Sequence, residues 1–250
     1  MNKIYLNFLI TLLAGLSTII GVIPIFLKEK NKEKIIATAL SFSSGVMLTI
    51  SLISLIPESS TLLSQIYKPL PAFLITSIFI IIGIIITNTI DLKLEEKITN
   101  TNLYKLGLMS TITLIIHNIP EGITTFLSTT ANQTLGLKLA ITIALHNIPE
   151  GISIAIPIYY STKSKLKAFI YTLIAGLSEL LGAIVAFIFL KKQLTDFTLG
   201  IILAITAGIM IDISIYEYLP SSFEYKKNKV TIYYFVLGIL IMFLTEFIIF

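Results

Sequence analysis

The residues best suited to chemistry form a hexapeptide that occurs twice, His-Asn-Ile-Pro-Glu-Gly at 117–122 and again at 146–151. The two copies contain the only two histidines of the chain. In a helix, His and Glu four positions apart lie on one face, and the Asn after the His flanks that face. Imidazole, carboxylate and amide groups are ligands of divalent metal ions. The candidate ligands are therefore His117, Asn118, Glu121, His146, Asn147 and Glu150.

The same hexapeptide modifies the helix that carries it. Pro120 and Pro149 each remove a backbone hydrogen bond, and a kink there would free the carbonyls of Ile116 and Leu145 to face a ligand or water. The glycine that ends each copy lets a neighbouring helix approach closely. We expect a broken helix beside a lined cavity.

The chain around these motifs cannot be an ordinary soluble protein. Of its 250 residues, 55% are hydrophobic and 13% are charged, and the mean hydropathy is +0.92. A soluble domain keeps about a quarter of its residues charged. The composition excludes a disordered chain, a collagen-like chain and a nucleic-acid binder with a basic face. The absence of cysteine excludes disulfides, thiolate zinc sites and cysteine nucleophiles. An integral membrane protein is indicated.

Eight apolar runs are long enough to cross a bilayer, which takes about 20 residues. The fold class is therefore all-α, a polytopic membrane protein with eight transmembrane helices in a single transporter domain, 1–250. The longest connection is expected at 91–105. The runs cover 4–27, 35–56, 70–90, 106–127, 139–160, 168–190, 197–219 and 230–250.

The lysines predict the orientation, because positively charged loops stay in the cytoplasm. The connections after the first, third, fifth and seventh helices hold 13 lysines. The N-terminus and the remaining connections hold five: Lys3, Lys68, Lys138, Lys191 and Lys192. We expect a multi-pass protein of the plasma membrane with both termini outside.

Two parts of the chain resemble each other. Residues 14–21 (AGLSTIIG) match 175–182 (AGLSELLG). Helices 1–3 therefore look related to helices 6–8, and the lysine count gives the two sets opposite orientations around helices 4 and 5. Inverted repeats with a site near the midplane are a transporter architecture. A second match pairs Gly45, Met47, Ser51 and Pro57 with Gly208, Met210, Ser214 and Pro220.

Glu179 lies in the sixth helix at the depth of both hexapeptides, near the bilayer centre. An ionised residue there costs at least about 2.5–3.5 kcal/mol. Three carboxylates at one depth, with no lysine beside them, call for a bound divalent cation. Glu179 is thus a seventh candidate ligand.

Other acids give a weaker signal. Glu58 and Glu217 lie near opposite membrane boundaries, where a solvated acid and a metal vestibule are both open interpretations. Asp212 in the seventh helix is also ambiguous. Glu246 is expected to be a surface or lipid-interface acid.

The doubled hexapeptide, Ser-Glu-Leu-Leu-Gly in the sixth helix, and the segments Gly-Val-Met-Leu and Gly-Ile-Met-Ile resemble the ZIP (Zrt/Irt-like) divalent-metal transporters, in particular their bacterial zinc-transporter branch. The resemblance covers essentially the whole chain. It implies eight helices, outward termini, and import of zinc through a site between helices 4, 5 and 6.

One metal would use His117, Glu121, His146 and Glu150. A second would use Asn118, Glu121, Asn147, Glu150 and Glu179, with Glu121 and Glu150 bridging. The loop between helices 3 and 4 is short and lacks the histidines of many relatives, so loop-based metal sensing or delivery is in doubt.

The expected function is zinc uptake into the cytoplasm, with broader activity on iron, manganese and cobalt because Asn and carboxylate ligands are harder. We expect no enzyme activity, no prosthetic group and no ATPase, since a P-loop is missing. The partners are divalent metal ions and the lipid bilayer, not nucleic acid; a homodimer is left open.

The alternatives are a membrane-embedded di-metal carboxylate enzyme, a proton-coupled carrier of another solute, and metal export. Di-metal carboxylate bundles use Glu-x-x-His pairs, whereas the order here is His-x-x-x-Glu.

Overall fold

The structure, a computed structural model, describes residues 3–26, 31–97, 102–190, 195–225 and 228–249. Within these ranges every element is helical, and consecutive elements join into the eight predicted transmembrane helices, which confirms the all-α class. The elements are α1 (Lys3–Leu16) with η1 (Ser17–Phe26); α2 (Lys32–Ile50), η2 (Ser51–Leu55) and α3 (Ile56–Ser64); α4 (Pro69–Lys97); α5 (Asn102–Ala131); α6 (Gln133–Thr162); α7 (Lys165–Val185) with η3 (Ala186–Leu190); α8 (Asp196–Asp212), η4 (Ile213–Tyr218) and α9 (Leu219–Tyr225); and α10 (Lys229–Ile249).

Seven continuous helical stretches in the described ranges are long and apolar enough to cross a membrane. The eighth helix, α5, has 30 residues but falls outside this group. Its length is ample, so its composition is the cause: it carries His117, Asn118, Glu121 and many hydroxyl side chains. One of the two helices that carry three candidate ligands each is thus the least apolar of the eight.

Two local expectations were wrong. The predicted connection 91–105 is largely helical, because α4 continues to Lys97 and α5 begins at Asn102. The helices do not break at Pro120 or Pro149, since α5 and α6 run unbroken through both. Departures from the α-helix occur elsewhere: η1 is a 3₁₀ segment, and η2, η3 and η4 are π-helical.

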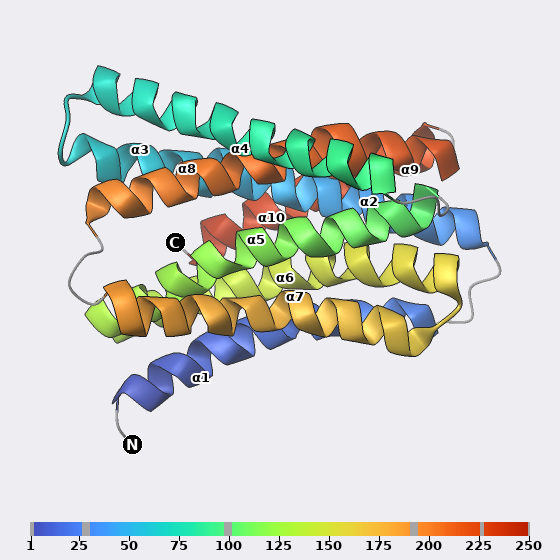
Figure 1. Cartoon of the computed structure of the whole chain (residues 1–250), viewed down its shortest axis with the longest axis horizontal. Coiled ribbons are helices and arrows are strands. Elements are labelled where there is room, and N and C mark those ends of the chain that lie inside the picture. The colour runs from blue at the N-terminus through green and yellow to red at the C-terminus, as the bar shows by residue number, and fades with distance from the viewer. Residues whose placement is uncertain (1–2, 27–30, 98–101, 191–194, 226–227, 250) are drawn as a thin grey trace.

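The helices alternate in direction, so α1 begins and α10 ends at the same end of the molecule (Figure 1). The described helix ends that flank the connections counted as lysine-rich lie at the opposite end. Several of the counted lysines fall outside the described residues: Lys28, Lys30, Lys191, Lys192, Lys226 and Lys227.

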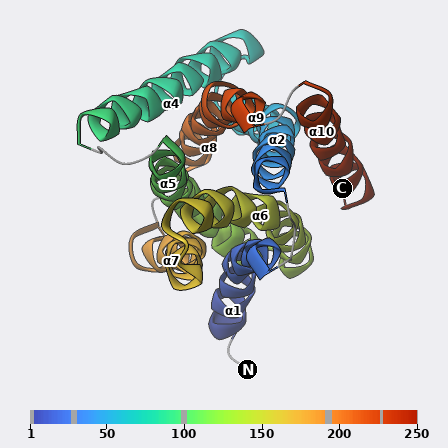
Figure 2. The same cartoon turned by 90° about the vertical axis from the view of Figure 1, so that its right-hand side faces the viewer.

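The packing repeats in the way that the two matching sequence halves predict. In the repeat, α6 is the counterpart of α5, and α10 is the counterpart of α4. α5 packs mainly on α7, and in the matching way α6 packs on η1. α4 packs on α8, and in the matching way α10 packs on α2. α1 and α7 run in opposite directions, as inverted repeats require (Figure 1). Seen along the bundle, α1, α5, α6 and α7 gather on one side and α2, α8 and α9 on the other, while α4 and α10 lie outermost (Figure 2).

Two glycines bring the site helices together. A methyl group on Gly122 of α5 would collide with the main-chain carbonyl of Glu179 on α7. In the matching place, a methyl group on Gly151 of α6 would collide with the carbonyl oxygen of Thr18 on η1. The last residue of each hexapeptide is therefore small because another helix backbone lies directly against it.

Candidate metal centre

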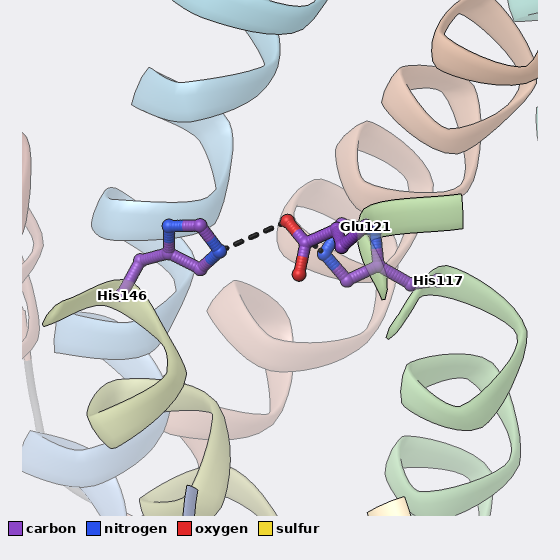
Figure 3. A group of neighbouring side chains, drawn as sticks. All are labelled: His117, Glu121 and His146. Atoms are coloured by element: carbon purple, nitrogen blue, oxygen red, sulfur yellow. Dashed lines mark hydrogen bonds and ion pairs between the residues drawn. The ribbon is translucent and has the colours of Figure 1, made fainter. Parts of the chain in front are cut away.

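The two hexapeptides meet in the middle of the bundle. His117 and Glu121 project from α5 and His146 from α6, and one ligand atom of each lies within 4.8 Å of the others (Figure 3). The Glu121 Oε1 atom is 2.9 Å from His146 Nε2 and 3.2 Å from His117 Nε2. Glu150 Oε1 lies 3.4 Å from His117 Nε2. All four side chains are buried, so the first predicted ligand set is assembled in one place.

The two asparagines orient their amide oxygens in the same way. The Asn118 Nδ2 group donates to the carbonyl of Ala175 on α7 at 2.9 Å, and Asn147 Nδ2 donates to the carbonyl of Ala14 on α1 at 3.0 Å. Ala14 and Ala175 are equivalent positions of the two repeats. Because the nitrogen of each amide is held by a neighbouring helix, its oxygen remains the free ligand atom.

Glu179 joins this group from α7. Its Oε1 atom accepts a hydrogen bond from Asn147 Nδ2, and its side chain is fully buried. The repeat places Thr18 of η1 at the equivalent position, and its hydroxyl donates to the Gly15 carbonyl at 2.7 Å. The candidate centre is therefore asymmetric, with a carboxylate contributed by only one repeat.

Each of the seven predicted residues has at least one buried side-chain nitrogen or oxygen without a hydrogen bond. Buried polar atoms are ordinarily paired, and an unpaired one costs about 1–3 kcal/mol. Such a concentration of buried nitrogen and oxygen atoms without hydrogen bonds fits a divalent cation, which would bind to imidazole, amide and carboxylate atoms of this kind. The atoms are Nδ1 and Nε2 of His117, Oδ1 of Asn118, Oε2 of Glu121, Nδ1 of His146, Oδ1 of Asn147, both carboxylate oxygens of Glu150, and Oε2 of Glu179.

A cavity reaches the centre from the end of the molecule where α5 ends and α6 begins. Glu121 and His146 line its inner part, and Thr124, Thr142 and Thr206 are also among its lining residues. Glu58 and Glu246 belong to the same cavity. Glu246, expected to be a surface or lipid-interface acid, is partly buried and lines this cavity, because α10 packs on α2 and so brings Glu246 beside the outer part of α2 and α3.

The remaining acids lie apart from the centre. Asp212 is buried and accepts a hydrogen bond from Asn88 Nδ2 of α4 at 3.0 Å. Glu217 is partly buried in η4 and contributes no atom to the metal-ligand group found in the described chain. The sequence also gave no sign that Ser43 of α2 donates to the carbonyl of Pro149, at 2.6 Å.

Comparisons with known proteins identify relatives over nearly the whole chain. Residues 93–246 match the model of a family described as ZIP Zinc transporter. The chain is 42% identical over 259 residues to the zinc transporter ZupT of Chlorobium phaeovibrioides, covering 97% of both chains. It is 37% identical to the ZupT of Streptococcus mutans, covering 96% of both, and 35% identical to that of Clostridium perfringens, covering 97% of this chain and 95% of the other.

Proposed function

The chain belongs to the ZIP zinc transporter family, and we propose that it carries Zn²⁺ through the membrane into the cytoplasm by way of the centre on α5, α6 and α7. Its relatives are named as transporters, so it is a transporter and not an enzyme. The observation that carries the proposal is the convergence of seven buried residues whose free side-chain atoms are all metal ligands.

Two metal positions account for these atoms. The first would use His117, Glu121, His146 and Glu150, and their contacts of 2.9–3.4 Å support binding of one ion by all four. The second would use the oxygens of Asn118 and Asn147 with Glu179, and would share Glu121 and Glu150 with the first. The imidazole-containing position suits Zn²⁺. The all-oxygen position would also accept Fe²⁺, Mn²⁺ and Co²⁺.

The cavity supplies an entry route for the ion. Glu58 and Glu246 lie along it before Glu121 and His146. Carboxylates that line a cleft raise the local concentration of cations and so increase the rate at which an ion arrives. We propose that this end faces the outside of the cell, with both termini, and that residues 1–250 act as a single transmembrane domain.

Uptake of radioactive zinc into vesicles that contain the purified protein tests the proposal. Saturable uptake is expected from the wild type, with competition by Fe²⁺, Mn²⁺ and Co²⁺. Glu121→Gln should abolish it, because the substitution removes a shared ligand charge with little change in volume. Glu224→Gln is the matched control, since Glu224 is exposed on α9. Wild-type uptake no greater than that of empty vesicles would reject the function, and equal uptake by both variants would reject the site.

A further inference from the structure

We propose that Tyr218 is a positioning residue for transport, whose hydroxyl keeps the metal path closed at the lysine-rich end of the molecule. The inference rests on the proposed transport function and assigns a residue that the metal centre itself does not use. Tyr218 is the last residue of η4 and is completely buried in the bundle.

The Tyr218 hydroxyl contacts both helices that carry the hexapeptides. It lies 2.8 Å from the hydroxyl of Ser153 on α6, and Ser110 on α5 is its second side-chain partner. Ser153 in turn donates to the main-chain carbonyl of Glu150 at 2.6 Å. One phenol therefore connects η4 to α5 and to the backbone of a proposed metal ligand.

These contacts lie on one side of the centre. Ser153 follows Glu150 by one turn towards the end of α6, and Ser110 precedes His117 by two turns towards the start of α5. The two helices run in opposite directions, so both serines lie on the side that leads to the lysine-rich end. The cavity with Glu58 and Glu246 lies on the other side of the centre. The cavity therefore lies on one side of the centre, and the Tyr218 contacts with α5 and α6 lie on the other.

The repeat supports a role in the path. The match of Ser51 with Ser214 pairs Tyr218 with Leu55, which is the last residue of the π-helical segment η2. Leu55 lines the cavity on the opposite side of the centre. π-Helical segments occur frequently at functional sites. The two segments thus place matching residues on the two sides of the centre, and of this pair only Tyr218 carries a hydroxyl, which contacts α5 and α6.

The chain has no cysteine, so a single introduced thiol reports on opening at this end. Thr113 is fully buried, three residues after Ser110 on the same face of α5, between the Tyr218 contact and His117. In sealed vesicles without zinc, a Thr113→Cys variant is treated with a membrane-impermeant thiol reagent on the lysine-rich side. Adding Tyr218→Phe should raise the modification rate about three- to tenfold, the range that corresponds to the net contribution of one hydrogen bond. Tyr216→Phe, an exposed neighbour in η4, should leave the rate unchanged.

Further variants separate closure from simple loss of structure. Ser153→Ala removes the same hydrogen bond from the α6 side, so it should raise the rate of thiol modification by a similar factor. In the double variant with Tyr218→Phe, the rate should be little higher than with Tyr218→Phe alone, because both changes remove one interaction. Zinc affinity of Tyr218→Phe should stay within about twofold of wild type, because the hydroxyl contacts no proposed ligand side chain. Leu114→Cys, also fully buried, serves as a second probe if Thr113→Cys folds poorly.

Equal modification rates with and without the Tyr218 hydroxyl would overturn the inference, as would an equal increase from Tyr216→Phe. Because labelling is measured without zinc, it is independent of the ion transported. Failure of wild-type zinc uptake would reject the proposed function, whereas unchanged labelling in a protein that does transport zinc would reject the role of Tyr218.

Discussion

Replacing Gly122 with alanine adds one methyl group at the contact between α5 and α7. The new carbon would lie 2.6 Å from the carbonyl carbon of Glu179 and 2.8 Å from its Cα, whereas ordinary contacts begin at 3.4 Å. The carbonyl oxygen of Glu179 lies closer still, so the helices must separate by more than about 0.8 Å, since main-chain atoms cannot move aside separately. Metal–ligand distances tolerate about 0.2 Å, so Glu179 can no longer reach the ion as before.

Misplaced supporting groups typically lower metal affinity about 10- to 100-fold, and we expect zinc uptake by Gly122→Ala to fall by that range. Overpacking also costs about 1–3 kcal/mol, which the higher helix propensity of alanine partly offsets. The measurement is zinc uptake per inserted protein, with zinc affinity of the purified variant measured by calorimetry.

Gly107→Ala is the matched control on the same helix. The nearest atoms to its added methyl group, at 2.8 Å, belong to the Ile158 side chain, and the Ile158 backbone nitrogen follows at 3.1 Å, so the backbone contact is looser than at Gly122. Uptake by this variant should stay close to that of wild type. Wild-type uptake and affinity in Gly122→Ala would refute the reasoning that this helix contact positions Glu179.

Three further outcomes are expected. Glu150→Ala should abolish uptake of every metal while the protein still inserts, because it removes a shared ligand and leaves neighbouring groups unpaired; uptake per inserted protein measures this. Changing Asn118 and Asn147 together to Asp should strengthen the binding of hard cations and slow turnover, because release becomes the costly step; relative uptake of Mn²⁺, Fe²⁺ and Zn²⁺ measures this. Zinc affinity should fall as pH drops from about 7 to about 5, because ligation needs neutral His and ionised Glu; calorimetry in two buffers of different ionisation enthalpy counts the protons released.

Each outcome can be contradicted. Normal zinc uptake by inserted Glu150→Ala would remove Glu150 from the site. An unchanged order of metals in the double Asp variant would show that the asparagines do not contact the ion. A proton count of zero with constant affinity over this pH range would exclude a centre of His and Glu ligands.

The arrangement of the site could be predicted because it depends on short-range spacing. A helix fixes where residues i and i+4 point, so the hexapeptide alone places His117 and Glu121 on one face. Its recurrence in the next helix, together with Glu179 at a similar depth, brings the groups to one level. The repeat was likewise visible, since Ala14 and Ala175 follow from a direct match and occupy equivalent places in the structure.

The missed features depend on which helices touch, which spacing along one helix does not determine. Glu246 enters the cavity because α10 packs on α2, 200 residues earlier in the chain. Tyr218 reaches Ser153 across 65 residues from a π-helical segment, where the widened turn shifts the side-chain register. The continuation of α4 and α5 into the predicted loop does not follow from the hydrophobic pattern, because the residues there are polar; Asp91 and Lys105 form an ion pair at 2.9 Å between the two helices.

The polar composition of α5 also constrains how the protein is made. Synthesis delivers α5 to the membrane before α6 and α7 exist, yet an ionised residue at the centre of a lone helix costs at least about 2.5 kcal/mol in lipid. Its main packing partners in the finished protein are those two later helices. α5 therefore depends on segments that leave the ribosome after it, and its stable insertion must wait until they arrive.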